Sequence, residues 1–265
     1  MPDNEPTSLN PERVRALQRA LTADQQELFQ LILSPDRQII SVLLRNPQLS
    51  EDHLLALLKR RDLAESLLKT IYRRYAHQLS HRLLLALVKN PVLPGALMRN
   101  LLPHLHLFEL VDLCFMPGIT PDQKLAAERT IVQRLPTTPL GNKMTLARRG
   151  TASVVGELLK DGDSRLVEIC LNNPRITEAA VFQFINGPRA NATTLSMIAR
   201  NSRWKSRPNL QLALLKNRQT PTIWFTLWVP HLPAHTVNQL LAGRRLTPAQ
   251  KNAVRDASKR SNRPR

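Results

Sequence analysis

The side chains most often used for metal binding and covalent chemistry are few and scattered in this sequence. Its 265 residues hold seven histidines and two cysteines, with no CxxC and no Cys/His cluster of metal-ligand spacing. His231 and His235 lie four positions apart, a spacing that suits two ligands on one helical face, but Pro233 stands between them. No phosphate-binding, dinucleotide-binding, zinc-protease or serine-hydrolase motif occurs. The sequence therefore predicts no metal, no cofactor, no catalytic residue and no recognisable small-molecule substrate.

A short basic segment instead indicates a binding function. It places four cations around one tryptophan, namely Arg200, Arg203, Trp204, Lys205 and Arg207. An indole beside Arg and Lys can stack on a nucleobase or on a guanidinium. An earlier segment again combines cations with aromatic rings, Arg73 and Arg74 between Tyr72 and Tyr75. Both segments are candidate polyanion-binding sites, although for Trp204 itself we favour a hydrophobic plug beneath its loop over a stacking ring.

Positive charge is concentrated in the last third of the chain. The formal net charge is +18, and residues 179–265 contribute 15 Lys or Arg against one carboxylate, Asp256. Arg244 and Arg245 form a further basic pair, and the chain ends in SKRSNRPR. A solvated surface normally mixes both signs. The asymmetry predicts either a surface for a polyanion such as nucleic acid or a charge that only keeps the protein soluble.

The elements that carry these residues belong to an internal duplication. Leu83 to Pro94 reads LLLALVKNPVLP, and Leu210 to Pro221 reads LQLALLKNRQTP, identical at seven of twelve positions. The same offset in numbering, 127, pairs Asn46-Pro47 with Asn173-Pro174 and Thr120-Pro121 with Thr247-Pro248, and it also pairs the two basic segments. The two Thr-Pro sequences, each with Gln three positions after the Thr, have the form of a helix-capping box. We therefore expect Asn90 and Asn217 to occupy equivalent corners between helices.

Helix breaks divide the chain into short apolar helices. Pro47, Pro91 and Pro117 each follow one apolar run and precede another, and proline cannot continue a helix because it lacks the N–H. Few glycines and no alternating apolar pattern argue against a β-sheet fold. The spacing predicts an all-α fold, an α-solenoid of helical pairs of about 42 residues each, a period typical of HEAT and armadillo arrays.

The pattern LLRNPQLSEDHLLALLKR, with its relatives at 85–97 and 168–181, resembles HEAT-like α-solenoids and the leucine-rich repeat variant family of bacteria. The resemblance covers most of residues 36–257 and implies a fold rather than a function, since such arrays serve as scaffolds, inhibitors and nucleic-acid binders. The leucine-rich repeat variant prototype has an N-terminal cysteine cluster for an iron–sulfur centre. This chain has no such cluster, so that cofactor is not expected.

The predicted organisation follows from these blocks. We expect a disordered N-terminus at 1–9, an N-terminal capping helix within 10–38, a first repeat block at 39–165, a second at 166–257, and a disordered basic tail at 258–265. Cys114 and Cys170 lie in apolar helical patterns and are expected to be buried thiols. No signal peptide and no apolar run of membrane-spanning length occurs, which predicts a cytoplasmic protein that does not enter a membrane.

Three functions compete on these grounds. The first is a non-catalytic scaffold that binds a protein partner. The second is the same scaffold binding nucleic acid through its basic last third. The third is an enzyme resembling the HEAT-like DNA glycosylases, which would need a carboxylate from earlier helices, for example Asp161, Asp163 or Glu168. We expect the first and keep the other two as alternatives.

Overall fold

The computed structural model describes residues 11–261, with the side chains of Arg260 and Ser261 excepted. These residues form α-helices and short 3-10 helices and contain no strand, as the sequence predicts for an all-α fold. Contacts between Cα atoms divide the chain into two units, Met1–Thr130 and Ile131–Arg265, here called unit 1 and unit 2. None of the described helices is long and apolar enough to cross a membrane.

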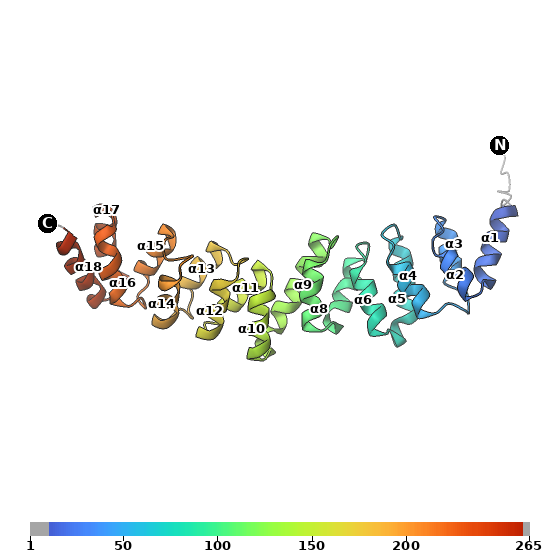
Figure 1. The fold of residues 1–265 in the computed structure, drawn as a ribbon, viewed down its shortest axis with the longest axis horizontal. Helices are drawn as coiled ribbons and strands as arrows, with labels where there is room; N and C mark the ends of the chain where they lie inside the picture. The colour runs from blue at the N-terminus through green and yellow to red at the C-terminus, as the bar shows by residue number, and fades with distance from the viewer. Residues whose placement is uncertain (1–10, 262–265) are drawn as a thin grey trace, which may run out of the picture. The chain divides into compact units, whose positions relative to one another are not determined.

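Unit 1 is built from helices of about two to four turns (Figure 1). They are α1 (Pro11–Thr22), α2 (Gln25–Leu31), α3 (Arg37–Leu43), α4 (Glu51–Leu58), α5 (Glu65–Tyr75), α6 (His81–Lys89), α7 (Gly95–Leu101), α8 (Leu107–Phe115) and α9 (Pro121–Arg134), whose last residues belong to unit 2. Helix α1 packs on α3, and α4 packs on both α2 and α6. Alternate helices of unit 1 therefore form neighbouring rows.

Unit 2 is also built from a succession of short helices. They are α10 (Leu140–Arg149), α11 (Ala152–Leu159), α12 (Ser164–Asn172), α13 (Glu178–Ile185), α14 (Ala192–Arg200), α15 (Pro208–Lys216), α16 (Thr222–Trp228), α17 (Ala234–Ala242) and α18 (Pro248–Ser261). One row runs α10, α12, α14 and the other runs α11, α13, α15. The bounds of α4, α6, α7, α8 and α9, each increased by 127, are those of α13, α15, α16, α17 and α18.

Buried asparagines hold the corners between helices at equivalent positions. Asn46 Nδ2 donates to the main-chain oxygens of Ala20 and Ala23, each at 3.0 Å. Asn173, which lies 127 positions later, donates through Nδ2 to Ala147 O at 2.7 Å and Arg148 O at 3.1 Å. In both cases Oδ1 accepts the N–H two positions on, at 2.7 Å. Because buried polar groups need partners, each asparagine satisfies main-chain oxygens that a helix end leaves open.

The first predicted helix is interrupted. Residues 11–31 form α1 and α2 rather than one capping helix, since Asp24 caps the start of a second helix. Its Oδ1 accepts the N–H of Gln26 and of Glu27, each at 2.9 Å. An aspartate at this position favours a new helix start over helix continuation. Helices α1 and α2 precede α3 as α10 and α11 precede α12.

The C-terminal prediction also changes. Residues 258–261, expected in a disordered tail, continue helix α18, while 262–265 and the expected disordered segment 1–9 lie outside the described residues. The capping boxes are confirmed. Thr120 N donates to Gln123 Oε1 and Gln123 N to Thr120 Oγ1, and Thr247 and Gln250 make the same two bonds at the start of α18.

Candidate partner-binding site

The tryptophan of the basic segment lies in the interior of unit 2. Trp204 is 2% exposed, and its Nε1 donates to Leu171 O at 3.0 Å. A buried indole whose donor is already used has no surface for a nucleobase. Trp204 is therefore the hydrophobic plug that its sequence context favoured, and its ring does not stack on a base.

Arg203 stabilises the turn on which Trp204 packs. Its guanidinium lies over the Trp204 ring, with Cζ 4.3 Å from the centroid, and donates to Asn173 O at 2.8 Å and Ile176 O at 3.0 Å. These carbonyls belong to the turn that follows α12. Because its donors are aimed at main-chain oxygens, Arg203 is a structural clamp rather than a free cation.

The other predicted residues do not form one surface. Arg200 lies 5.9 Å from the Trp224 ring centroid, and Arg207 Nη1 is 3.9 Å from Glu178 Oε2. Lys205 is exposed. In unit 1, Arg74 Nη1 donates to Leu44 O at 2.5 Å, while Arg73 is exposed. Most of the cations in the two basic segments therefore contact their own unit.

Arg244 and Arg245 lie elsewhere in unit 2, at the edge of a hollow. This hollow, of about 560 Å³, precedes the N-terminus of α18, and Lys216 and Arg218 line it as well. A second hollow of about 740 Å³ shares Lys216 and Arg245 and is lined by Phe182 and Leu212. We call these two adjoining hollows the unit 2 groove. Phe182 is 46% exposed, so the groove offers an aromatic surface beside the cations.

The cations of the unit 2 groove have no internal partner. Within residues 11–261, the side chains of Lys216, Arg218, Arg244 and Arg245 make no hydrogen bond or ion pair. Glu178, the one carboxylate at the groove, faces Arg207. Unpaired cations at the rim of a low-dielectric surface attract anionic groups.

Unit 1 has a hollow built from the corresponding positions. It measures about 650 Å³ and is lined by Leu55, Leu85, Ala86 and Lys89, which the 127-residue offset pairs with Phe182, Leu212, Ala213 and Lys216. The rims differ. Pro91, Pro117 and Gly118 stand where unit 2 has Arg218, Arg244 and Arg245, whereas the unit 1 hollow has cations of its own, Lys59, Arg61 and Arg82. The two hollows therefore carry their cations at different positions.

Sequence reasoning missed Phe182, Lys216 and Arg218 as groove residues. Two features of the sequence could have indicated them. Lys216 lies in the stretch that matches residues 83–94, and Phe182 stands where the 127-residue offset places Leu55, an aliphatic residue. What the sequence did not show is that α13, α15 and the turn before α18 meet at one place.

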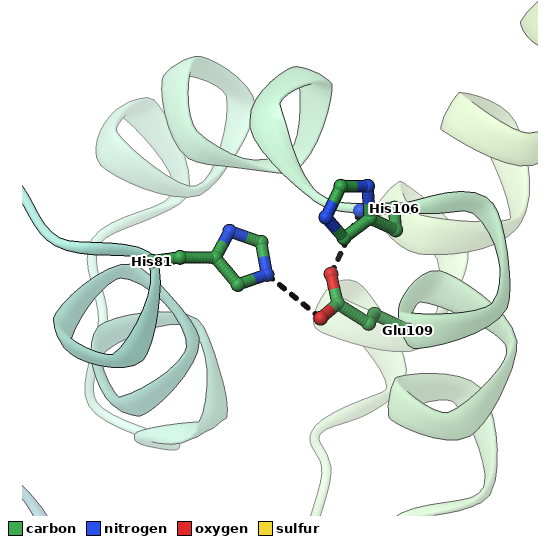
Figure 2. A group of neighbouring side chains, drawn as sticks. All are labelled: His81, His106 and Glu109. Carbon is green, nitrogen blue, oxygen red and sulfur yellow. Dashed lines mark hydrogen bonds and ion pairs between the residues drawn. The ribbon is translucent and has the colours of Figure 1, made fainter.

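A second group of side chains was also missed, in unit 1. His81 begins α6, while His106 and Glu109 stand at the start of α8, and their side chains converge (Figure 2). His81 Nε2 lies 2.7 Å from Glu109 Oε1, and the two imidazole centroids are 4.8 Å apart. His106 N donates to Glu109 Oε2 at 2.7 Å. Partial burial raises the pKa of Glu109, but the hydrogen bonds from His81 and His106 outweigh it and lower that pKa below its usual value.

Of the three carboxylates considered for glycosylase chemistry, two pair with cations outside the unit 2 groove and the third is exposed away from it. Asp161 Oδ2 accepts from Lys143 Nζ at 2.7 Å. Asp163 caps α12 and pairs with Arg165, whose hydrogen bond lowers the pKa of that carboxyl. Glu168 is exposed on α12, and none of the three lines the unit 2 groove.

No protein-family model matches this chain, and no curated protein or solved structure matches it either. The resemblance to HEAT-like and leucine-rich repeat variant arrays therefore stays a prediction.

Proposed function

We propose that this chain is a non-catalytic binding scaffold, an α-solenoid built by tandem duplication of a 127-residue block. The support is the repeated order and bounds of the helices in the two units, together with the buried asparagines at matching corners. In such an array each helical pair buries its apolar face against the next pair, and the stacked pairs leave repeated grooves on the surface that a partner can occupy.

The partner that fits the unit 2 groove best is a protein segment that carries acidic side chains beside an apolar one. The observation that carries this proposal is the exposed ring of Phe182 next to unpaired cations. An apolar side chain of the partner would cover Phe182 and Leu212, which removes apolar surface from water. Carboxylates of the partner would reach Lys216 and Arg245, and Arg218 and Arg244 would steer its approach.

Nucleic acid is the second candidate partner, and one observation favours it. From residue 179 to residue 255 the sequence contains no carboxylate, so phosphates would meet little repulsion anywhere along this part of unit 2. Burial of Trp204 removes the proposed stacking platform but not the electrostatic attraction. Such binding would be independent of nucleotide sequence, because it rests on phosphate contacts.

A direct comparison of probes separates the two partners. Fluorescence anisotropy would measure binding of a labelled peptide with alternating Asp/Glu and Leu/Phe residues, and of random double- and single-stranded DNA, at low and physiological salt. A scaffold for acidic segments retains the peptide at physiological salt, since part of that affinity is apolar, whereas DNA binding falls steeply with salt. DNA that binds more tightly than the peptide at both salt concentrations would favour the second candidate. Absence of binding by every probe at low salt would contradict both.

A further inference from the structure

The cluster of His81, His106 and Glu109 in unit 1 is independent of the unit 2 groove. We propose that these three side chains bind one Zn²⁺ ion. Each offers one ligand atom, and the three atoms lie within 4.8 Å of one another. Two imidazole nitrogens and one carboxylate oxygen are a donor set that zinc accepts, and three protein ligands leave a fourth tetrahedral position open.

The required change of geometry is small. With Zn–N and Zn–O bonds of about 2.0–2.2 Å, neighbouring ligands of a tetrahedral site lie about 3.3–3.6 Å apart. His81 Nε2 and Glu109 Oε1, now 2.7 Å apart, must separate slightly, and the His106 ring must turn toward them. The His81 side chain is 42% exposed and His106 is exposed as well, so both rings have room to rotate.

One ligand is already held in place. The Oε2 atom of Glu109 accepts the main-chain N–H of His106, which leaves Oε1 facing His81 (Figure 2). A carboxylate fixed by a hydrogen bond to its second oxygen is a common feature of metal ligands, because it sets the direction of the first oxygen. The same bond ties the carboxylate to the residue that supplies the second imidazole.

The corresponding positions of unit 2 show that the fold does not require these residues. His81, His106 and Glu109 are replaced there by Pro208, Pro233 and Thr236, while α15 and α17 keep the bounds of α6 and α8 after the offset. His106 and Glu109 also form the capping box of α8, but α17 starts at the equivalent place without one. Capping therefore does not account for His81, which approaches Glu109 from another helix and adds a second imidazole to the pair.

The test is a titration of the full-length, metal-free protein with Zn²⁺ by isothermal calorimetry, and with Co²⁺ by visible absorption. We expect one Zn²⁺ per chain and the intense absorption bands of tetrahedral Co²⁺. His81→Pro introduces the residue found at the corresponding position of unit 2, so it should leave the fold intact. It should weaken Zn²⁺ binding at least about tenfold, because removal of even a hydrogen-bond partner of a metal ligand costs about that much affinity. Glu109→Gln should weaken binding to a similar extent.

His104→Gln is the matched control, because His104 is exposed in the same unit, two positions from His106 and outside the cluster. It should bind Zn²⁺ like the unaltered protein. Circular dichroism of each variant without metal shows whether its helices are intact. The proposal is overturned if the unaltered protein binds no Zn²⁺, or if intact His81→Pro and Glu109→Gln variants bind it as tightly as His104→Gln does.

Discussion

Asn90 and Asn217, which lie 127 positions apart in the sequence, make corresponding hydrogen bonds in different units. Asn90 Nδ2 donates to Leu58 O at 3.0 Å, and Asn217 Nδ2 donates to Ile185 O, the corresponding position, at 2.5 Å. Each Oδ1 accepts the N–H two positions on. The main-chain oxygen of each asparagine also accepts from a capping glutamine, Gln123 or Gln250. Each corner thus connects the ends of three helices through one asparagine.

The first prediction concerns these corners. Asn90→Ala and Asn217→Ala should each lower the free energy of unfolding by about 1–3 kcal/mol, because each leaves buried main-chain groups without a partner. Urea denaturation followed by circular dichroism would measure the effect. Asn100→Ala, on the exposed side of α7, serves as the control and should change stability by less than about 0.5 kcal/mol. The two corners would not be equivalent if the free energies of unfolding of Asn90→Ala and Asn217→Ala differed from each other as much as either differs from that of the control.

A second prediction separates structure from binding in the basic loop. Trp204→Phe keeps an aromatic ring but leaves Leu171 O unpaired, and Arg203→Ala removes the clamp on the 173–176 turn. Each should lower the free energy of unfolding by about 1–3 kcal/mol. Lys205→Ala should leave stability unchanged within about 0.5 kcal/mol, because the Lys205 side chain is exposed. A stable Arg203→Ala variant would show that the observed contacts contribute little.

The third prediction concerns the two thiols. Burial raises the pKa of Cys114 and of Cys170 to about 12, so both remain neutral in the folded protein at pH 8. A thiol-specific reagent should label them slowly until denaturant is added, because the thiolate is the reactive form. Rapid labelling of the native protein would show that α8 or α12 opens readily.

The same shifts imply a pH dependence of stability. The folded pKa of each thiol is raised, so their contribution is complete below the unfolded pKa of about 8.5 and is lost as pH rises from there toward about 12. Stability measured by urea denaturation should therefore decline above pH 8.5, and less so in a Cys114→Ala/Cys170→Ala variant. An equal decline in both proteins would assign the effect to other groups.

Much of the fold could be predicted because helix breaks are local events. Pro47, Pro91 and Pro117 stop helices wherever they stand, and the capping boxes at Thr120 and Thr247 follow from a few adjacent residue types. The break at Asp24 was missed because the apolar pattern continues across it, and only the carboxylate that caps α2 reveals the new helix. Periodicity alone does not show such a competing cap.

The sites were harder to predict because they depend on contacts distant in sequence. A tryptophan among cations has the same sequence pattern whether its ring faces solvent or, like Trp204, packs beneath its own loop. His81 and Glu109 are far apart in the chain and meet only because α6 and α8 begin near each other. Arg244 and Arg245 were identified from charge, but their neighbours in the groove required the packing of unit 2.

A fourth prediction tests the charge of the unit 2 groove. Arg244→Gln/Arg245→Gln should weaken binding of the labelled acidic peptide by at least about tenfold at low salt, since each charge-assisted contact contributes roughly 1 kcal/mol or more. Lys205→Gln/Arg255→Gln removes two exposed cations outside the groove and should have a much smaller effect. Equal losses in the two double variants would indicate attraction by net charge rather than by this groove.

If the unit 2 groove receives an apolar side chain of an acidic protein segment, Phe182 must contribute to the binding. The measurement is the affinity of the labelled acidic peptide for Phe182→Ala at physiological salt, compared with Ile223→Ala, which removes an exposed apolar side chain of unit 2 outside the groove. The account predicts that Phe182→Ala weakens binding by at least about tenfold, the equivalent of roughly 1.4 kcal/mol, and that Ile223→Ala leaves it unchanged. Equal affinity of the two variants would contradict it.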